Sequence, residues 1–87
     1  MGSKHSVLIS IGKKIRQYRS VQGYTQEDFA ARSGLDRAYY GGVERGERNI
    51  SALNLMNIAL ALEIEVGELF PKLDVLKSLL DTDDAAL

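Results

Sequence analysis

The side chains best able to do chemistry in this sequence are basic, and they are concentrated in one half of the chain. Residues 12–49 hold eight lysines and arginines against five acids, whereas residues 50–87 hold two lysines against seven acids. The eight are Lys13, Lys14, Arg16, Arg19, Arg32, Arg37, Arg45 and Arg48. Ammonium and guanidinium groups bind anions, so this distribution indicates an anionic partner on one side of the molecule. The alternative, two solvated faces of an ordinary domain, fits the charges alone equally well.

Residues for catalysis or for metal binding are not assembled in this pattern. The 87 residues include one histidine, no cysteine, no Ser/His/Asp set and no phosphate-binding glycine loop. His5 stands alone near the N-terminus, and Asp81, Asp83 and Asp84 are expected to lie in a frayed, solvated tail, residues 81–87. We therefore expect no enzyme, no metal and no cofactor.

The composition also favours a single small cytoplasmic domain. No apolar run reaches the roughly 18 residues that a membrane span needs, and no signal peptide is recognised. The absence of cysteine is compatible with a reducing compartment.

The elements that must position the basic side chains are helices. Apolar residues repeat at spacings of three and four, and strand patterns are nearly absent. The pattern predicts an all-α fold with helices over about residues 7–22, 25–33, 36–45 and 52–62, a short helix at 66–70 and another at 72–80. The segment 52–62 is apolar on most sides, so we expect it to be the most buried helix.

Two of these helices are short and are joined by a tight turn. Thr25 and Asp28 form a capping box at the start of the first, and Gly34 can adopt the left-handed conformation that ends it. Ala30 is small where the two helices would cross. This order and spacing indicate a helix-turn-helix. With Tyr40 and Val43 on the core, the opposite face of the second helix would carry Arg37, Ala38, Gly41, Gly42 and Arg45.

The run "GYTQEDFAARSGLDRAYYGGVERGERNIS", residues 23–51, resembles the Cro/CI-type (XRE-type) helix-turn-helix family. Within that family it looks most like the controller proteins of restriction–modification systems, and the similarity extends over about residues 8–70. The resemblance implies a five-helix, lambda-repressor-like DNA-binding domain at 7–70, here followed by a C-terminal helical extension and acidic tail at 71–87. Such domains bind a palindromic operator in double-stranded DNA as homodimers, with the third helix (36–45) in the major groove.

The family's DNA-contacting positions can be carried over by motif. Base reading falls to Arg37, which can bond guanine O6 and N7, with Ala38, Tyr39 and Gly42 beside it. Phosphate contacts fall to Gln26, Arg45, Arg48 and Asn49. Ala38 replaces the larger polar residues of many relatives, so the base code itself does not transfer.

Two further features of the motif have structural interpretations. Arg19 and Glu44 occupy positions that the family uses for an internal ion pair, so Arg19 is expected to be structural. Gly41 and Gly42 cost a helix interior about 1 kcal/mol each relative to alanine. We interpret glycine there as allowing the helix to approach DNA closely; the alternative is tolerance of a poor helix former at an exposed position.

The C-terminal part supplies a candidate dimer interface. Its apolar stripe is too large to leave comfortably in water: Leu69, Phe70, Leu73, Leu76 and Leu80. The last helix could also fold back on its own domain.

The sequence therefore predicts a dimeric, sequence-specific transcription regulator, a controller of a restriction–modification operon, with RNA polymerase as a further candidate partner. A phage or plasmid repressor is compatible with the same residues. A different class, an antitoxin or adaptor that grips a protein through the leucine stripe, also remains open.

Overall fold

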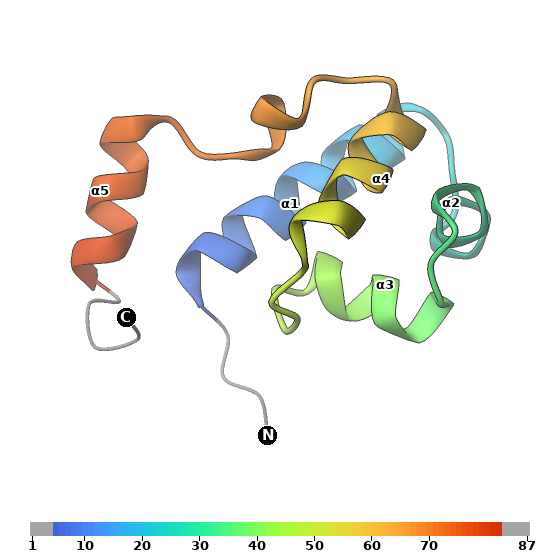
Figure 1. Ribbon diagram of the computed structural model, residues 1–87, viewed down its shortest axis with the longest axis horizontal. Coiled ribbons are helices and arrows are strands. Elements are labelled where there is room, and N and C mark those ends of the chain that lie inside the picture. The colour runs from blue at the N-terminus through green and yellow to red at the C-terminus, as the bar shows by residue number, and fades with distance from the viewer. Residues whose placement is uncertain (1–4, 83–87) are drawn as a thin grey trace.

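The computed structural model describes residues 5–82 and is built from helices alone in that range (Figure 1). The α-helices are α1 (Ser6–Val21), α2 (Gln26–Ser33), α3 (Arg37–Glu44), α4 (Ala52–Leu62) and α5 (Leu73–Thr82), with a 3-10 helix, η1 (Val66–Leu69), before α5. The predicted all-α architecture is confirmed, and each predicted helix is present within about two residues of its expected bounds. The predicted frayed tail is wrong for Asp81 and Thr82, which belong to α5; the rest of that prediction, residues 83–87, lies outside the described residues.

Each of the first four helices begins at a side chain that caps it. Thr25 Oγ1 accepts from the backbone N–H of Asp28 at 3.0 Å, and Ser51 Oγ accepts from that of Asn54 at 3.1 Å. Asp36 and His5 play the same part for α3 and α1. His5, for which the sequence suggested no role, therefore satisfies one of the free N–H groups at the start of α1.

The core lies where α1, α2, α3 and α4 meet. Its largest fully buried side chains are Tyr40, Phe29, Ile15, Ile58, Leu62 and Leu69. The rings of Phe29 and Tyr40 pack in a tilted arrangement with centroids 5.4 Å apart, which joins α2 to α3.

Two glycines set the placement of α3. Gly34 ends α2 with a φ of 74°, in the left-handed region that glycine adopts without strain, and thereby directs the chain into α3. Gly12 lies against the end of α3, where a Cβ would come within 2.5 Å of the Val43 and Glu44 carbonyl oxygens. Both positions therefore favour glycine for geometric reasons.

The C-terminal helix α5 lies against α1, at the opposite end of the molecule from α2 (Figure 1). Ser6 Oγ donates to the Leu79 carbonyl of α5 at 3.3 Å, and the Tyr18 hydroxyl donates to Glu68 of η1. The expectation that the last helix folds back on its own domain is consistent with these contacts.

Candidate nucleic-acid interface

The helix α3 is held from behind and open in front. Tyr40 and Val43 are buried on its inner side, whereas Arg37, Ala38 and Arg45 are exposed on its outer side. Within the described part of the chain, Arg37 forms no hydrogen bond or ion pair, and Arg45 pairs only with the exposed Glu47, at 3.1 Å. The outer face therefore offers guanidinium groups that can donate to an external acceptor.

The two glycines of α3 are not part of an open face, contrary to the sequence-based expectation. Both are buried, because arginine side chains lie over them. A Cβ at residue 41 would come 2.7 Å from Arg37 Nη1 and 3.1 Å from Arg45 Nη1. A Cβ at residue 42 would come 3.0 Å from Cγ of Arg48.

Tyr39, Arg48 and Asn54 form a small cluster beside the outer face of α3. The Arg48 guanidinium carbon lies 5.6 Å from the centroid of the Tyr39 ring, within cation–π range. Asn54 Nδ2 lies 3.5 Å from the Tyr39 hydroxyl oxygen, at the limit of a hydrogen bond. Asn49 is exposed next to this cluster. Two of the proposed DNA-contacting residues, Tyr39 and Arg48, thus lie together at one edge of α3, and Asn49 follows Arg48 in the chain.

Gln26, the proposed phosphate contact at the start of α2, is half-buried and already engaged. Its Nε2 donates to Glu44 Oε1 at 2.8 Å. An amide nitrogen carries two N–H donors, so this bond leaves one donor and the carbonyl oxygen for another partner.

Glu44 accepts hydrogen bonds from three helices. Arg19 donates through Nε to Oε2 at 2.6 Å and through Nη2 to Oε1 at 3.2 Å, and Tyr40 and Gln26 donate as well. Burial alone would raise the pKa of Glu44, but the hydrogen bonds from these three side chains together hold that pKa below its ordinary value. Burial, followed by the hydrogen bond to Glu44, raises the pKa of Tyr40. The carboxylate is therefore charged and fixes the end of α3 against α1 and α2.

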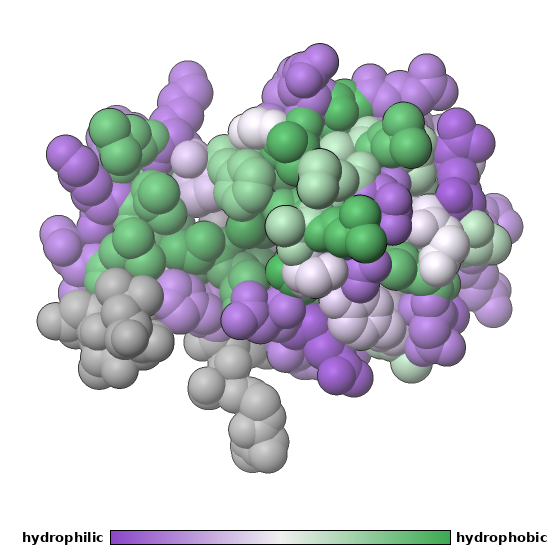
Figure 2. Space-filling model, viewed as in Figure 1, coloured by the Kyte–Doolittle hydropathy of each residue, from purple (hydrophilic) through white to green (hydrophobic). Residues whose placement is uncertain are grey.

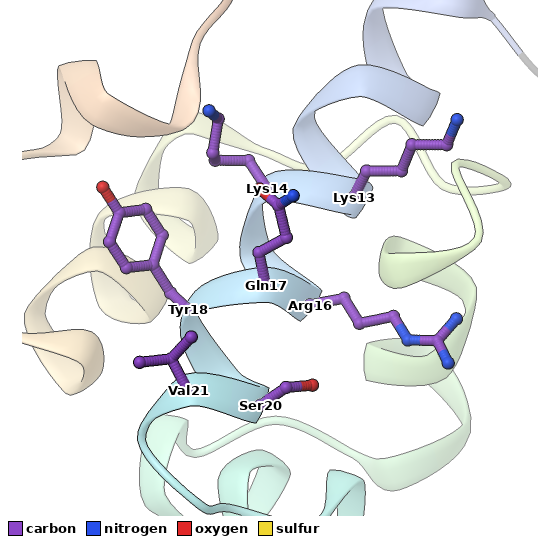
Figure 3. A pocket seen from close by; sticks show the side chains of 7 residues that line it. All are labelled: Lys13, Lys14, Arg16, Gln17, Tyr18, Ser20 and Val21. Atoms are coloured by element: carbon purple, nitrogen blue, oxygen red, sulfur yellow. The ribbon is translucent and has the colours of Figure 1, made fainter.

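A second basic surface lies on the outward side of α1. Lys13, Lys14 and Arg16 are exposed there around a shallow hollow that also includes Gln17. Figure 3 shows Lys13 and Arg16 extending to one side of the helix, away from Tyr18 and Val21. The hollow is lined by α1 alone, so it offers charge to an anion without enclosing one.

The predicted dimer stripe is wrong at one position. Leu69 is 1% exposed and belongs to the core, because η1 turns it inward against α4, so it is not available to a second molecule. Phe70 and Leu73 are exposed, the latter 67%, whereas Leu76 and Leu80 are half-buried.

The helix α4 is not the most buried helix, as its composition suggested it would be; five of its eleven residues are buried, against five of eight in α3. Leu53, Met56 and Leu60 are exposed on it, Leu60 by 75%. Figure 2 shows hydrophobic side chains gathered over α4 and α5 on the same face of the molecule. The spacing of three and four between Leu53, Met56 and Leu60 could have indicated this exposure from the sequence. It marks a second apolar face of α4, opposite Leu55, Ile58 and Leu62.

Other kinds of site are not found in the described residues. No group of three acids or histidines there is placed to hold a metal ion. None of the described helices combines the length and the hydrophobicity that crossing a bilayer requires.

The short helices α2 and α3, their left-handed glycine turn and the exposed basic outer face of α3 define a helix-turn-helix domain. The helix-turn-helix family model matches residues 15–69. The chain belongs to this family and is a DNA-binding transcriptional regulator of the XRE type.

The relatives found by comparison include restriction–modification controllers. Control protein C.MunI from Mycoplasma sp is 38% identical over 71 residues, covering 80% of this chain and 96% of the relative. The crystal structure of controller protein C.AhdI from Aeromonas hydrophila is 49% identical with a TM-score of 0.73, covering 75% of this chain and 98% of that one. The structure of the biofilm regulator SinR in complex with DNA is 32% identical with a TM-score of 0.65, covering 68% and 95%. The resemblance stated from the sequence is thereby confirmed.

Proposed function

We propose that this chain is a homodimeric, sequence-specific regulator that reads a palindromic operator with α3, and that it controls a restriction–modification operon. The observation that carries this proposal is the exposed, basic outer face of α3 with its buried inner face. The similarity to controller proteins such as C.MunI and C.AhdI supports the kind of operon. Its site of action would then be cytoplasmic DNA, and the proposal assigns it no catalytic activity.

In this proposal Arg37 reads guanine through paired hydrogen bonds in the major groove, and Ala38 meets an apolar base edge such as a thymine methyl. Tyr39 packs along the backbone or a base step. Gln26, Arg45, Arg48 and Asn49 contact phosphates, which position α3 but carry no sequence information directly. SinR, a structural relative solved with DNA, supports DNA as the partner.

The proposed dimer forms through the apolar face of α4 and the exposed residues at the start of α5. A single helix-turn-helix reads only a few base pairs, so tight binding at cellular salt needs two linked domains. The exposed residues Leu53, Met56, Leu60, Phe70 and Leu73 supply an apolar surface of the kind that a second copy covers. The domain of residues 7–70 would then bind DNA, and the extension of residues 71–87 would contribute to the dimer.

The test is a selection of bound duplexes from a random pool by the whole chain, followed by sedimentation of the protein with and without the selected duplex. We expect an enriched two-fold symmetric sequence and two protein chains per duplex. Enrichment of no sequence would contradict specific reading. A monomer that binds DNA weakly but forms a tight complex with another protein would favour the adaptor class. Whether RNA polymerase is recruited is tested by adding it to the selected complex.

A further inference from the structure

The side chain of Arg48 lies across α3 at Gly42, where no side chain of α3 stands in its way. Arg48 follows α3 by a turn and returns over Gly42, where a Cβ would meet its Cγ at 3.0 Å and its Nε at 3.3 Å. Separations this short are tighter than those of ordinary Cβ contacts. An alanine at residue 42 would therefore push the arginine stem outward by a few tenths of an ångström.

The guanidinium end of Arg48 contacts Tyr39. The Arg48 guanidinium lies over the Tyr39 ring, with 5.6 Å between its central carbon and the ring centroid. The Tyr39 hydroxyl lies 3.5 Å from Asn54 of α4, which restrains the ring. Gly42 thus lies below the stem of Arg48, and Tyr39 lies below its guanidinium, at the edge of α3.

The preceding residue repeats the arrangement. Arg37 and Arg45 both extend over Gly41, so two guanidinium groups converge above a residue without a side chain. Consecutive glycines therefore underlie three arginines of the proposed interface. The helix backbone at these two positions is therefore covered by side chains, and it is not open to direct approach by DNA.

We propose that Gly42 is a positioning residue for DNA recognition, one that orients Arg48 on the Tyr39 ring before DNA arrives. This inference rests on the proposed function, because the orientation matters only if Arg48 contacts an acceptor. Holding a long side chain in its bound orientation before binding reduces the conformational entropy that is lost on binding. The poor helix propensity of glycine is the accompanying disadvantage.

A double-mutant cycle distinguishes this proposal from the alternative that Gly42 allows the backbone of α3 to approach DNA closely. Affinity for the selected duplex is measured for the wild type, Gly42→Ala, Arg48→Ala and the double variant. We expect Gly42→Ala to weaken binding about two- to fivefold, the equivalent of an exposed cation–π contact, and to cause no further loss in the Arg48→Ala background. If the glycine instead allowed DNA to approach, Gly42→Ala would cost the same with or without Arg48, and that result would overturn the inference.

A matched control is Gly67→Ala. Gly67 is exposed, and a Cβ there meets no atom within 4 Å. We expect wild-type affinity from this variant. A loss equal to that of Gly42→Ala would count against a specific role for Gly42.

The orientation of Arg48 is also measurable without DNA. The Arg48 Nε–H resonance, assigned by ¹H–¹⁵N correlation on the whole chain, is expected to be shifted by the ring of Tyr39. Tyr39→Leu should remove that shift, and Gly42→Ala should reduce it. Unchanged resonances in both variants would overturn the inference even if DNA binds, whereas failure of the wild type to bind any duplex would overturn the proposed function and leave the measured orientation standing.

Discussion

Arg19 Nε lies 2.6 Å from Glu44 Oε2, and this ion pair joins the first helix to the last turn of α3. The arginine also donates to the Tyr24 carbonyl at 2.8 Å, so its guanidinium is used inside the domain. The side chains are 12% and 2% exposed. The position of α3 therefore depends on a charged group that is not itself placed to contact DNA.

Arg19→Ala is expected to lower the free energy of unfolding by about 3–5 kcal/mol, since it leaves the nearly buried Glu44 carboxylate without its cation. Thermal unfolding followed by circular dichroism measures this. Arg16→Ala, an exposed arginine on the same helix, is the control and should melt like the wild type. An unchanged midpoint for Arg19→Ala combined with weaker DNA binding would reassign Arg19 to the interface.

Stability should fall in acid because of Glu44. Its pKa is lowered in the folded protein, so its contribution is complete above its ordinary value of 4.5 and is lost as the pH falls through the lower, folded value. Midpoints measured from pH 7 to pH 2 should therefore drop less steeply for Glu44→Gln than for the wild type. Glu47→Gln, at an exposed pair, should keep the wild-type slope; parallel curves for all three proteins would contradict the assignment.

Arg37→Ala should cost about 1–3 kcal/mol for each half-site of the selected duplex and relax base preference at one position of each half-site. The reason is that a paired contact to guanine is lost while the phosphate contacts remain. Competition binding against duplexes varied at each position measures both effects. Equal losses on selected and random DNA would show that Arg37 does not read a base.

Arg48→Ala should weaken binding to all duplexes similarly and reduce the slope of log affinity against log salt by about one unit for each bound chain. One phosphate charge per chain is then no longer neutralised by the protein. Titrations at several salt concentrations give the slope. A slope equal to that of the wild type would remove Arg48 from the phosphate contacts, and Gln26→Ala, which removes no charge, should leave the slope unaltered.

Leu60→Glu and Leu73→Glu should yield folded monomers, because each places a carboxylate on the proposed apolar interface. Sedimentation velocity gives the oligomeric state. Val21→Glu is the matched control, since Val21 is an exposed apolar residue at the far end of α1. Persistent dimers would show that the interface lies elsewhere.

Leu69→Glu should unfold the chain, because Leu69 lies in the core.

Local signals in the sequence were sufficient for the helices and their order. Thr25, Asp36 and Ser51 cap the helices that they were expected to begin, and Gly34 adopts the expected left-handed turn. These features depend on residues within one helical turn of each other, so sequence reasoning reaches them.

The predictions that were wrong concern which residues are covered by other side chains in the fold. Gly42 is covered by a side chain six positions away across the turn at Gly46, and no local pattern records where an arginine stem will lie. The apolar composition of α4 does not state whether Leu60 has a neighbour in the fold, and Leu69 and Leu73 are alike in type but not in burial. The candidate site was thus predicted as a set of residues but not as an arrangement.

The attachment of Glu44 to three helices has a consequence for redesign. All its hydrogen-bonding partners approach from behind α3 or from within it, and Arg37 and Ala38 take no part in the network. Substituting other residues for Arg37 and Ala38 should therefore change which operator the protein binds, while the tilt of the recognition helix stays constant. Natural divergence of operator sequence would then require changes at the front of α3 and none in its support.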